Sequence, residues 1–201
     1  MFFDPARLPF IPRLVDNWRA IRHELDSAEE SSFRPWRERH IYDREWSVLL
    51  LFDGYQRCSP VRVEENSIAF PATTSILDKI PGLLSAGFSR LGPNTRIKPH
   101  RGYDHNVLRV HLGLRVPEHC GIRVRGQTRR WNEGKCLVFD DTFIHEAWNL
   151  ASVPRTVLLI DIALKSRPSV ALSDAVERLR PVEAVQWGLQ WLRFVGRTLR
   201  L

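Results

Sequence analysis

The sequence has few cysteines and no long apolar run. Its three cysteines, Cys58, Cys120 and Cys136, are irregularly spaced without a Cys-x-x-Cys pair, which argues against a disulfide framework. The residues after Met1 lack the basic stretch and apolar block of a signal peptide, and no segment approaches membrane-spanning length. We therefore expect a cytoplasmic protein that touches membranes at most peripherally.

The signatures of several nucleotide- and nucleic-acid-binding classes are also missing. There is no dinucleotide glycine fingerprint and no alternating strand and helix rhythm, which disfavours a doubly wound fold. Zinc-finger spacing and an interleaved ladder of aromatic and basic residues are absent too, so we do not expect nucleic acid as a partner. The 30 Lys and Arg residues against 23 Asp and Glu give a net charge of +7, which favours carboxylates, phosphates, acidic peptides or membrane surfaces.

The composition supports one well-packed domain with flanking helices. The chain has 201 residues, of which 43% are hydrophobic, including seven tryptophans. Apolar residues at helical spacing from Pro12 to about Ala28 predict an N-terminal helix packed on the main domain. We expect an N-terminal helical segment at 1–44, a β domain at 45–165 and a C-terminal helical segment at 166–201.

The central part of the chain reads as short strands separated by turn residues. The first predicted strand is the apolar run at 46–52, and one or two short helices, interrupted by Pro81, are predicted within 71–84. Strands at this spacing, with Gly, Pro and Asn between them, predict a mainly β sandwich or barrel. The remaining predicted strands are 87–91, 95–100, 107–115, 120–124, 134–140 and 156–164.

The last part of the chain, 169–201, has a different pattern. Its apolar spacing predicts two helices divided near Pro181, the second rich in aromatic residues and arginine. We expect these helices to pack against the barrel or against a homodimer partner. The alternative is a basic amphipathic helix that makes a peripheral membrane contact.

The predicted strand at 107–115 alternates strictly. Arg109, His111 and Gly113 share one face, and the leucine and valine residues between them share the other. One face should therefore pack a core while the other lines a polar interior. The alternative is an outer strand whose polar face meets water.

Two histidines and an arginine, far apart in the sequence, form a candidate metal site. His100 ends a predicted strand, His145 lies in an aromatic and polar stretch, and Arg155 begins the last strand. Two imidazoles with open coordination positions suit a redox iron, and a guanidinium grips a carboxylate through two parallel hydrogen bonds. Where many iron oxygenases place an Asp or Glu two residues after the first histidine, this chain has Gly102.

These residues carry a family resemblance over about 45–165. The chain resembles the aspartyl/asparaginyl β-hydroxylase family of Fe(II)- and 2-oxoglutarate-dependent oxygenases, which includes lipid A 2-hydroxylases. The motifs that carry it are Ser89 eleven residues before His100, His100-Arg101-Gly102, Arg109-x-His111-x-Gly113, Phe139-Asp140-Asp141-x-Phe143-x-His145-Glu146-x-x-Asn149, and Arg155.

The resemblance implies a double-stranded β-helix, a jelly-roll or cupin-like core, with His100 and His145 as the iron ligands. Members lack the usual carboxylate ligand, so Gly102 fits, and an aspartate introduced there should keep or tighten iron binding. Asp104, four residues after His100, is the alternative third ligand. The residues that the resemblance assigns to the 2-oxoglutarate pocket are Ser89, Arg109, His111 and Arg155.

The implied activity is hydroxylation of an unactivated C–H bond with Fe(II), 2-oxoglutarate and dioxygen. The favoured substrate is the β-carbon of an aspartyl or asparaginyl residue or amino acid, in a peptide, on a carrier or free. A lipid acyl chain is the alternative. Two other classes remain open: a non-catalytic cupin-like protein that binds a small anion at Arg155, and a zinc hydrolase that takes a third ligand from Asp104 or Glu146.

Overall fold

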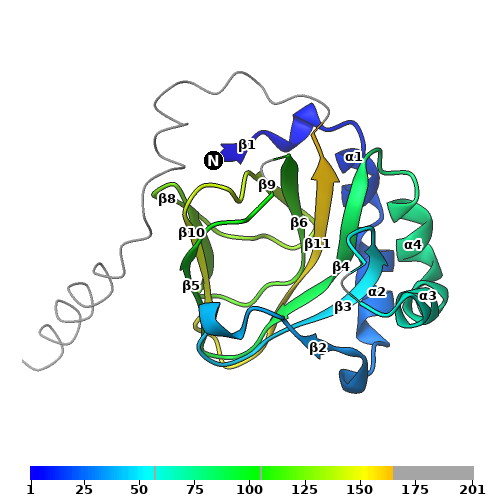
Figure 1. Cartoon of the computed structure of the whole chain (residues 1–201), viewed down its shortest axis with the longest axis horizontal. Coiled ribbons are helices and arrows are strands. Elements are labelled where there is room, and N and C mark those ends of the chain that lie inside the picture. The colour runs from blue at the N-terminus through cyan, green and yellow to red at the C-terminus, as the bar shows by residue number, and fades with distance from the viewer. Residues whose placement is uncertain (57, 105, 165–201) are drawn as a thin grey trace, which may run out of the picture. The chain divides into compact units, whose positions relative to one another are not determined.

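Two antiparallel sheets face each other across the interior of the protein (Figure 1). The computed structural model describes residues 1–56, 58–104 and 106–164. The strands of the larger sheet, in spatial order, are β1 (Phe2–Phe3), β9 (Cys136–Phe139), β6 (Val107–Arg115), β11 (Arg155–Ala163), β4 (Leu83–Leu91), β3 (Trp46–Asp53) and β2 (Arg34–Pro35).

The smaller sheet supplies the opposite wall. From β4 to β11 the chain crosses repeatedly between the two sheets, and every neighbouring pair of strands is antiparallel. This connectivity is that of a jelly roll, so the predicted double-stranded β-helix is confirmed. The strands of the smaller sheet, in spatial order, are β5 (Thr95–His100), β10 (His145–Asn149), β7 (Cys120–Val124) and β8 (Gln127–Arg129).

Helices cover the outer face of the larger sheet (Figure 1). The predicted N-terminal helix is present as two helices, because Asn17 between them has a non-helical backbone, with φ −104° and ψ 8°. None of the described helices is long and apolar enough to cross a membrane. The helices are α1 (Ile11–Asp16), α2 (Trp18–Asp26), α3 (Pro60–Ala69) and α4 (Pro71–Leu77), with short 3-10 helices at Pro5–Arg7, Glu30–Ser32 and Arg39–Ile41.

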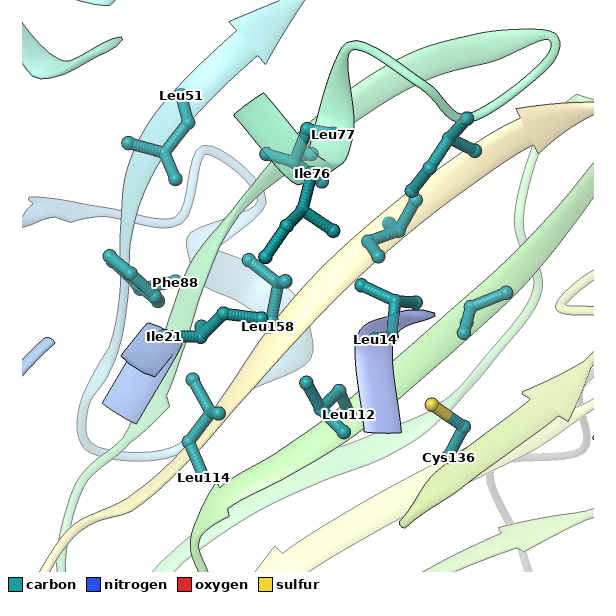
Figure 2. Packing of buried hydrophobic residues seen from close by; sticks show 14 of the residues in the cluster. Leu14, Ile21, Leu51, Ile76, Leu77, Phe88, Leu112, Leu114, Cys136 and Leu158 are labelled. Carbon is teal, nitrogen blue, oxygen red and sulfur yellow. The ribbon is translucent and has the colours of Figure 1, made fainter. Parts of the chain in front are cut away.

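The alternation along the strands divides the apolar residues into two cores. On β6 and β11, one face packs against the helices, where Leu14 and Ile21 meet Leu112 and Leu158 (Figure 2). The other face points between the sheets. The predicted alternation of β6 is confirmed and the water-facing alternative is wrong, because His111 is only 7% exposed.

Most predicted strands match, but some elements were not predicted. The strands predicted at 95–100, 107–115 and 120–124 are β5, β6 and β7. By contrast, α3, β8 and β10 were not predicted. The short, polar strand β10 alternates buried and half-buried residues, with a register shift between His145 and Ala147.

The segment at 1–44 contributes strands as well as helices. β1 pairs with β9, and β2 pairs with β3, so both edges of the larger sheet come from this segment. The loop after β2 also reaches the smaller sheet, through a bridge between Tyr42 and Ile97. The helices predicted at 166–201 lie outside the described residues.

Candidate metal and co-substrate site

His100 and His145 lie side by side on neighbouring strands. They are direct partners in the β5–β10 register, and their ring centroids are 4.0 Å apart. His145 is buried, and His100 is half-buried at the edge of a pocket. The fold therefore brings together the two residues that the sequence proposed as metal ligands.

Backbone carbonyls fix the tautomer of both rings. Nδ1 of His100 is 2.8 Å from the carbonyl oxygen of Lys98, and Nδ1 of His145 is 3.0 Å from that of Phe143. Because a carbonyl only accepts, each Nδ1 carries the proton and each Nε2 keeps a lone pair, as in metal-binding imidazoles. Burial lowers the pKa of His100 and takes that of His145 well below its ordinary value, so both rings are neutral at neutral pH.

The place of the missing carboxylate ligand is occupied by another side chain. A Cβ built on Gly102 would lie 2.4 Å from Cγ of Asp141, and the backbone N–H of Gly102 donates to the carbonyl of Asp141 at 2.8 Å. Only glycine permits this close approach. The carboxylate of Asp141 thus fills the space into which a side chain at position 102 would extend.

The alternative third ligands do not join the histidine pair. The exposed carboxylate of Asp104 accepts a hydrogen bond from the N–H of Asn106 at 2.9 Å. That of Glu146 pairs with Arg123 at 2.9 Å. Within the part of the chain that the structure describes, no group of three or more His, Cys, Asp or Glu side chains could hold a metal ion.

Arg109 is enclosed by two buried carboxylates. Its Nε and Nη2 donate to Asp161 at 2.7 and 3.1 Å, and its Nη1 lies 3.1 Å from Asp141. Burial alone would lower the pKa of Arg109, but the two carboxylates raise it above its usual value. Arg109 therefore holds Asp141 beside Gly102. Its expected role as a direct 2-oxoglutarate ligand remains a prediction.

Arg155 is a buried cation with no carboxylate within ion-pair distance among the described residues. Its Nη1 donates to the carbonyl of Ser89 at 3.4 Å, its guanidinium lies 4.5 Å from the centroid of the Trp131 ring, and its Nε has no partner. Burial lowers the pKa of Arg155 to about 10. Such a charge is costly without a counter-ion, so Arg155 could bind the carboxylate of a ligand.

Two neutral donors accompany this cation. The hydroxyl of Ser89 accepts from Nε1 of Trp46 at 2.9 Å and can still donate its own hydrogen. Nδ1 of His111 accepts from Nε1 of Trp131 at 3.3 Å, so the proton of His111 is on Nε2, which is buried without a partner. Burial, reinforced by Arg155, takes the pKa of His111 well below its ordinary value. We call Ser89, His111, Trp131 and Arg155 the anion pocket.

A cavity of about 370 Å³ lies beside His100, which is part of its lining. We call it the outer pocket. Its lining includes His100, Gly102 and Asp141, together with the stacked rings of Trp36 and Trp46, which we call the aromatic wall.

Sequence reasoning missed several of these residues. Trp131 comes from the loop before β9, and Trp36 from the loop after β2. Neither has periodic neighbours that mark it, although each is an isolated tryptophan in a polar stretch. Asp141 lies in the motif that carries the family resemblance, but its approach to Gly102 depends on the folded arrangement.

This chain is similar to several known proteins. The profile of the family described as Aspartyl/Asparaginyl beta-hydroxylase matches residues 15–164. The ornithine lipid ester-linked acyl 2-hydroxylase of Rhizobium tropici is 36% identical over 170 residues, which cover 79% of this chain and 59% of that protein. The aspartyl/asparaginyl beta-hydroxylase of Homo sapiens is 34% identical over 163 residues, which cover 76% of this chain and 21% of that protein.

Among solved structures, a prolyl-4-hydroxylase from Pseudomonas putida aligns with a TM-score of 0.48 at 15% identity, over 78% of this chain and 100% of the other. The family assignment rests on the profile, whose match includes the strands that carry His100, His145 and Arg155. The resemblance inferred from the motifs is thereby confirmed. The chain belongs to the aspartyl/asparaginyl beta-hydroxylase family.

Proposed function

We propose that the protein is an Fe(II)- and 2-oxoglutarate-dependent hydroxylase. The observation that carries this proposal is the combination of two adjacent, neutral imidazoles with a buried guanidinium that has no carboxylate partner among the described residues. The first feature fits a metal ion with open coordination positions, and the second fits a dianionic co-substrate.

In this proposal His100 and His145 hold the iron through Nε2, and Arg155 binds the distal carboxylate of 2-oxoglutarate. Ser89 and His111 would donate further hydrogen bonds to the same co-substrate. When bound, iron, 2-oxoglutarate and dioxygen supply the oxidation: one oxygen atom enters the substrate C–H bond, and the other enters succinate as carbon dioxide is released.

The protein itself would position the co-substrate and supply charges that act on it and on the metal ion. The anion pocket is buried, so the Arg155 charge acts on a carboxylate with little competition from water. Two neutral imidazoles do not offset the charge of a metal ion, and the carboxylate of Asp141, held by Arg109, would offset part of it from beside Gly102.

The substrate is proposed from the family. The two relatives described above are named for an ornithine lipid acyl chain and for aspartyl or asparaginyl residues, so a lipid acyl chain and an aspartyl or asparaginyl β-carbon are the two candidates. We also propose a cytoplasmic location, supported by the free thiols of Cys58, Cys120 and Cys136. A homodimer and a peripheral membrane contact remain proposals.

The test is an anaerobic titration with Fe(II) and 2-oxoglutarate that monitors the weak visible metal-to-ligand band. The wild type should develop the band. Arg155→Met, which keeps an unbranched apolar stem but loses the guanidinium and its charge, should need a much higher 2-oxoglutarate concentration. Arg130→Met, at an exposed position, is the matched control and should titrate like the wild type. Absence of the band in the wild type would refute the proposal, and a band without any succinate release under oxygen would favour the non-catalytic alternative.

A further inference from the structure

Arg155 has few contacts that fix its position. Its guanidinium donates one hydrogen bond to the carbonyl of Ser89 at 3.4 Å and lies over the face of the Trp131 ring. This hydrogen bond is long, so the side chain takes its place mainly from the backbone that carries it. Residues that hold this backbone therefore determine where the charge of the anion pocket lies.

The side-chain amide of Asn149 is bound to three backbone carbonyls near Arg155. Its Nδ2 donates to Val153 at 2.9 Å, to Leu91 at 3.0 Å and to Gly92 at 2.9 Å. Two hydrogens serve three acceptors, so one of these bonds is shared. Val153 lies two residues before Arg155, and Leu91 is the direct partner of Arg155 in the β4–β11 register. One amide thus holds the backbone on both strands next to Arg155.

The orientation of this amide is fixed from its oxygen side. Oδ1 of Asn149 accepts from Sγ of Cys120 at 3.1 Å and from the backbone N–H of Ala151 at 3.1 Å. Because donors surround the oxygen and carbonyls surround the nitrogen, a reversed amide would lose these hydrogen bonds. The side chain is fully buried, so an amide that lost them would stay unsatisfied.

Asn149 also connects the two halves of the candidate site. It lies on β10 of the smaller sheet, four residues after His145 and on the same inward face. Its acceptor Leu91 lies on β4 of the larger sheet, two residues after Ser89. One buried side chain therefore links the strand of a proposed iron ligand to the strands of the anion pocket.

We propose that Asn149 is a positioning residue for the co-substrate, which sets the place of Arg155 relative to the two histidines and thereby the affinity for 2-oxoglutarate. The inference rests on the proposed function and adds a residue that acts through Arg155. A misplacement of about 1 Å can cost about 100-fold in rate, so a small shift of the backbone at Arg155 is enough.

The test measures, in the full chain, the 2-oxoglutarate concentration that half-develops the visible band with Fe(II), together with thermal unfolding. Asn149→Ala should raise this concentration about tenfold. Asn66→Ala is the matched control, because the Asn66 amide also donates to a strand carbonyl, that of Leu50 at 2.8 Å, but ties α3 to β3. It should lower the unfolding temperature and leave the 2-oxoglutarate requirement unchanged.

A double variant tests whether the effect runs through Arg155. Added to Arg155→Met, Asn149→Ala should raise the 2-oxoglutarate requirement by less than about twofold, because the group that it positions is already lost. If Asn149→Ala does not fold, Asn149→Ser, whose hydroxyl is too short to reach all three carbonyls, is judged by the same criteria.

Two results would overturn the inference: an unchanged 2-oxoglutarate requirement in the single variant, or full additivity with Arg155→Met. Either result, with the band present in the wild type, would leave the proposed function standing. Absence of the band in the wild type would instead refute the proposed function.

Discussion

Gly102 and Asp141 share one space: the Cβ that any other residue would place at position 102 meets the Asp141 carboxylate at 2.4 to 2.5 Å. Position 102 has no side chain that could bind a metal, and the carboxylate of Asp141 lies in the space that such a side chain would occupy. Arg109 holds that carboxylate at 3.1 Å, so glycine, aspartate and arginine form one structural unit.

The family resemblance predicts that Gly102→Asp keeps or tightens Fe(II) binding, but the position of Asp141 predicts the opposite. The new side chain would collide with Asp141 and add a like charge, and overpacking of this kind costs about 1–3 kcal/mol. We expect Gly102→Asp to be less stable than the wild type and to bind Fe(II) more weakly. Anaerobic Fe(II) titration and thermal unfolding measure the two effects.

The double variant Gly102→Asp with Asp141→Gly removes the collision and should recover part of the Fe(II) affinity. Gly126→Asn is the control, because nothing lies within 4 Å of a Cβ built there, and asparagine tolerates its positive φ of 75°. Tighter Fe(II) binding by the single variant Gly102→Asp would contradict the steric argument.

The Arg109–Asp161 pair should be important for stability. Asp161→Asn removes one of two carboxylates from a largely buried guanidinium, and breaking a buried pair from one side costs about 3–5 kcal/mol. Urea unfolding should show this loss. Asp26→Asn breaks exposed pairings with Arg115 and Arg22 instead and should cost about 0–1 kcal/mol. Equal losses in the two variants would show that burial does not determine the effect.

The N-terminal strand should support the metal site. Phe2 contacts Phe139 with ring centroids 6.0 Å apart, and Phe139 in turn lies 5.0 Å from His111 and 6.0 Å from His145. Phe2→Ala should therefore lower stability by about 3 kcal/mol and weaken Fe(II) binding, both measurable by calorimetry. Phe3→Ala, on the neighbouring and less buried residue, should leave Fe(II) affinity unchanged. If Phe2→Ala left the Fe(II) affinity unchanged, this strand would not support the metal site.

The fold could be predicted largely because polar and apolar residues alternate along its strands. The β6 pattern places Arg109 and His111 on one face by geometry alone, and the structure agrees. Strand β10 could not be predicted in the same way. It is short and bulged, and its half-buried face carries Glu146 and Trp148, so its identity as a strand comes from pairing with β5 and β7.

Candidate site residues could be predicted where they stand in a sequence motif. Those whose position depends on packing between distant segments could not. The histidines and Arg155 stand in recognisable motifs. The occupation of the Gly102 space by Asp141 depends on the distance between two loops, and the aromatic wall depends on the loop after β2 reaching β3. Such long-range approaches leave no local pattern in a sequence.

The final prediction concerns the tautomer of His111. Because Nε1 of Trp131 donates to Nδ1 of His111, the proton of His111 is on Nε2, which is buried without a partner. Trp131→Phe keeps an aromatic ring but removes this donor, so the imidazole can adopt either tautomer. The hydrogen bond from His111 to 2-oxoglutarate is then no longer preorganised, and loss of that bond, worth about 1.4 kcal/mol, would raise the KM for 2-oxoglutarate by up to about tenfold, while Fe(II) affinity stays the same. Trp148→Phe on the outer side of β10 controls for general loosening. If Trp131→Phe changed Fe(II) affinity and the KM equally, the tryptophan would act through packing of the whole barrel and not through the proton on His111.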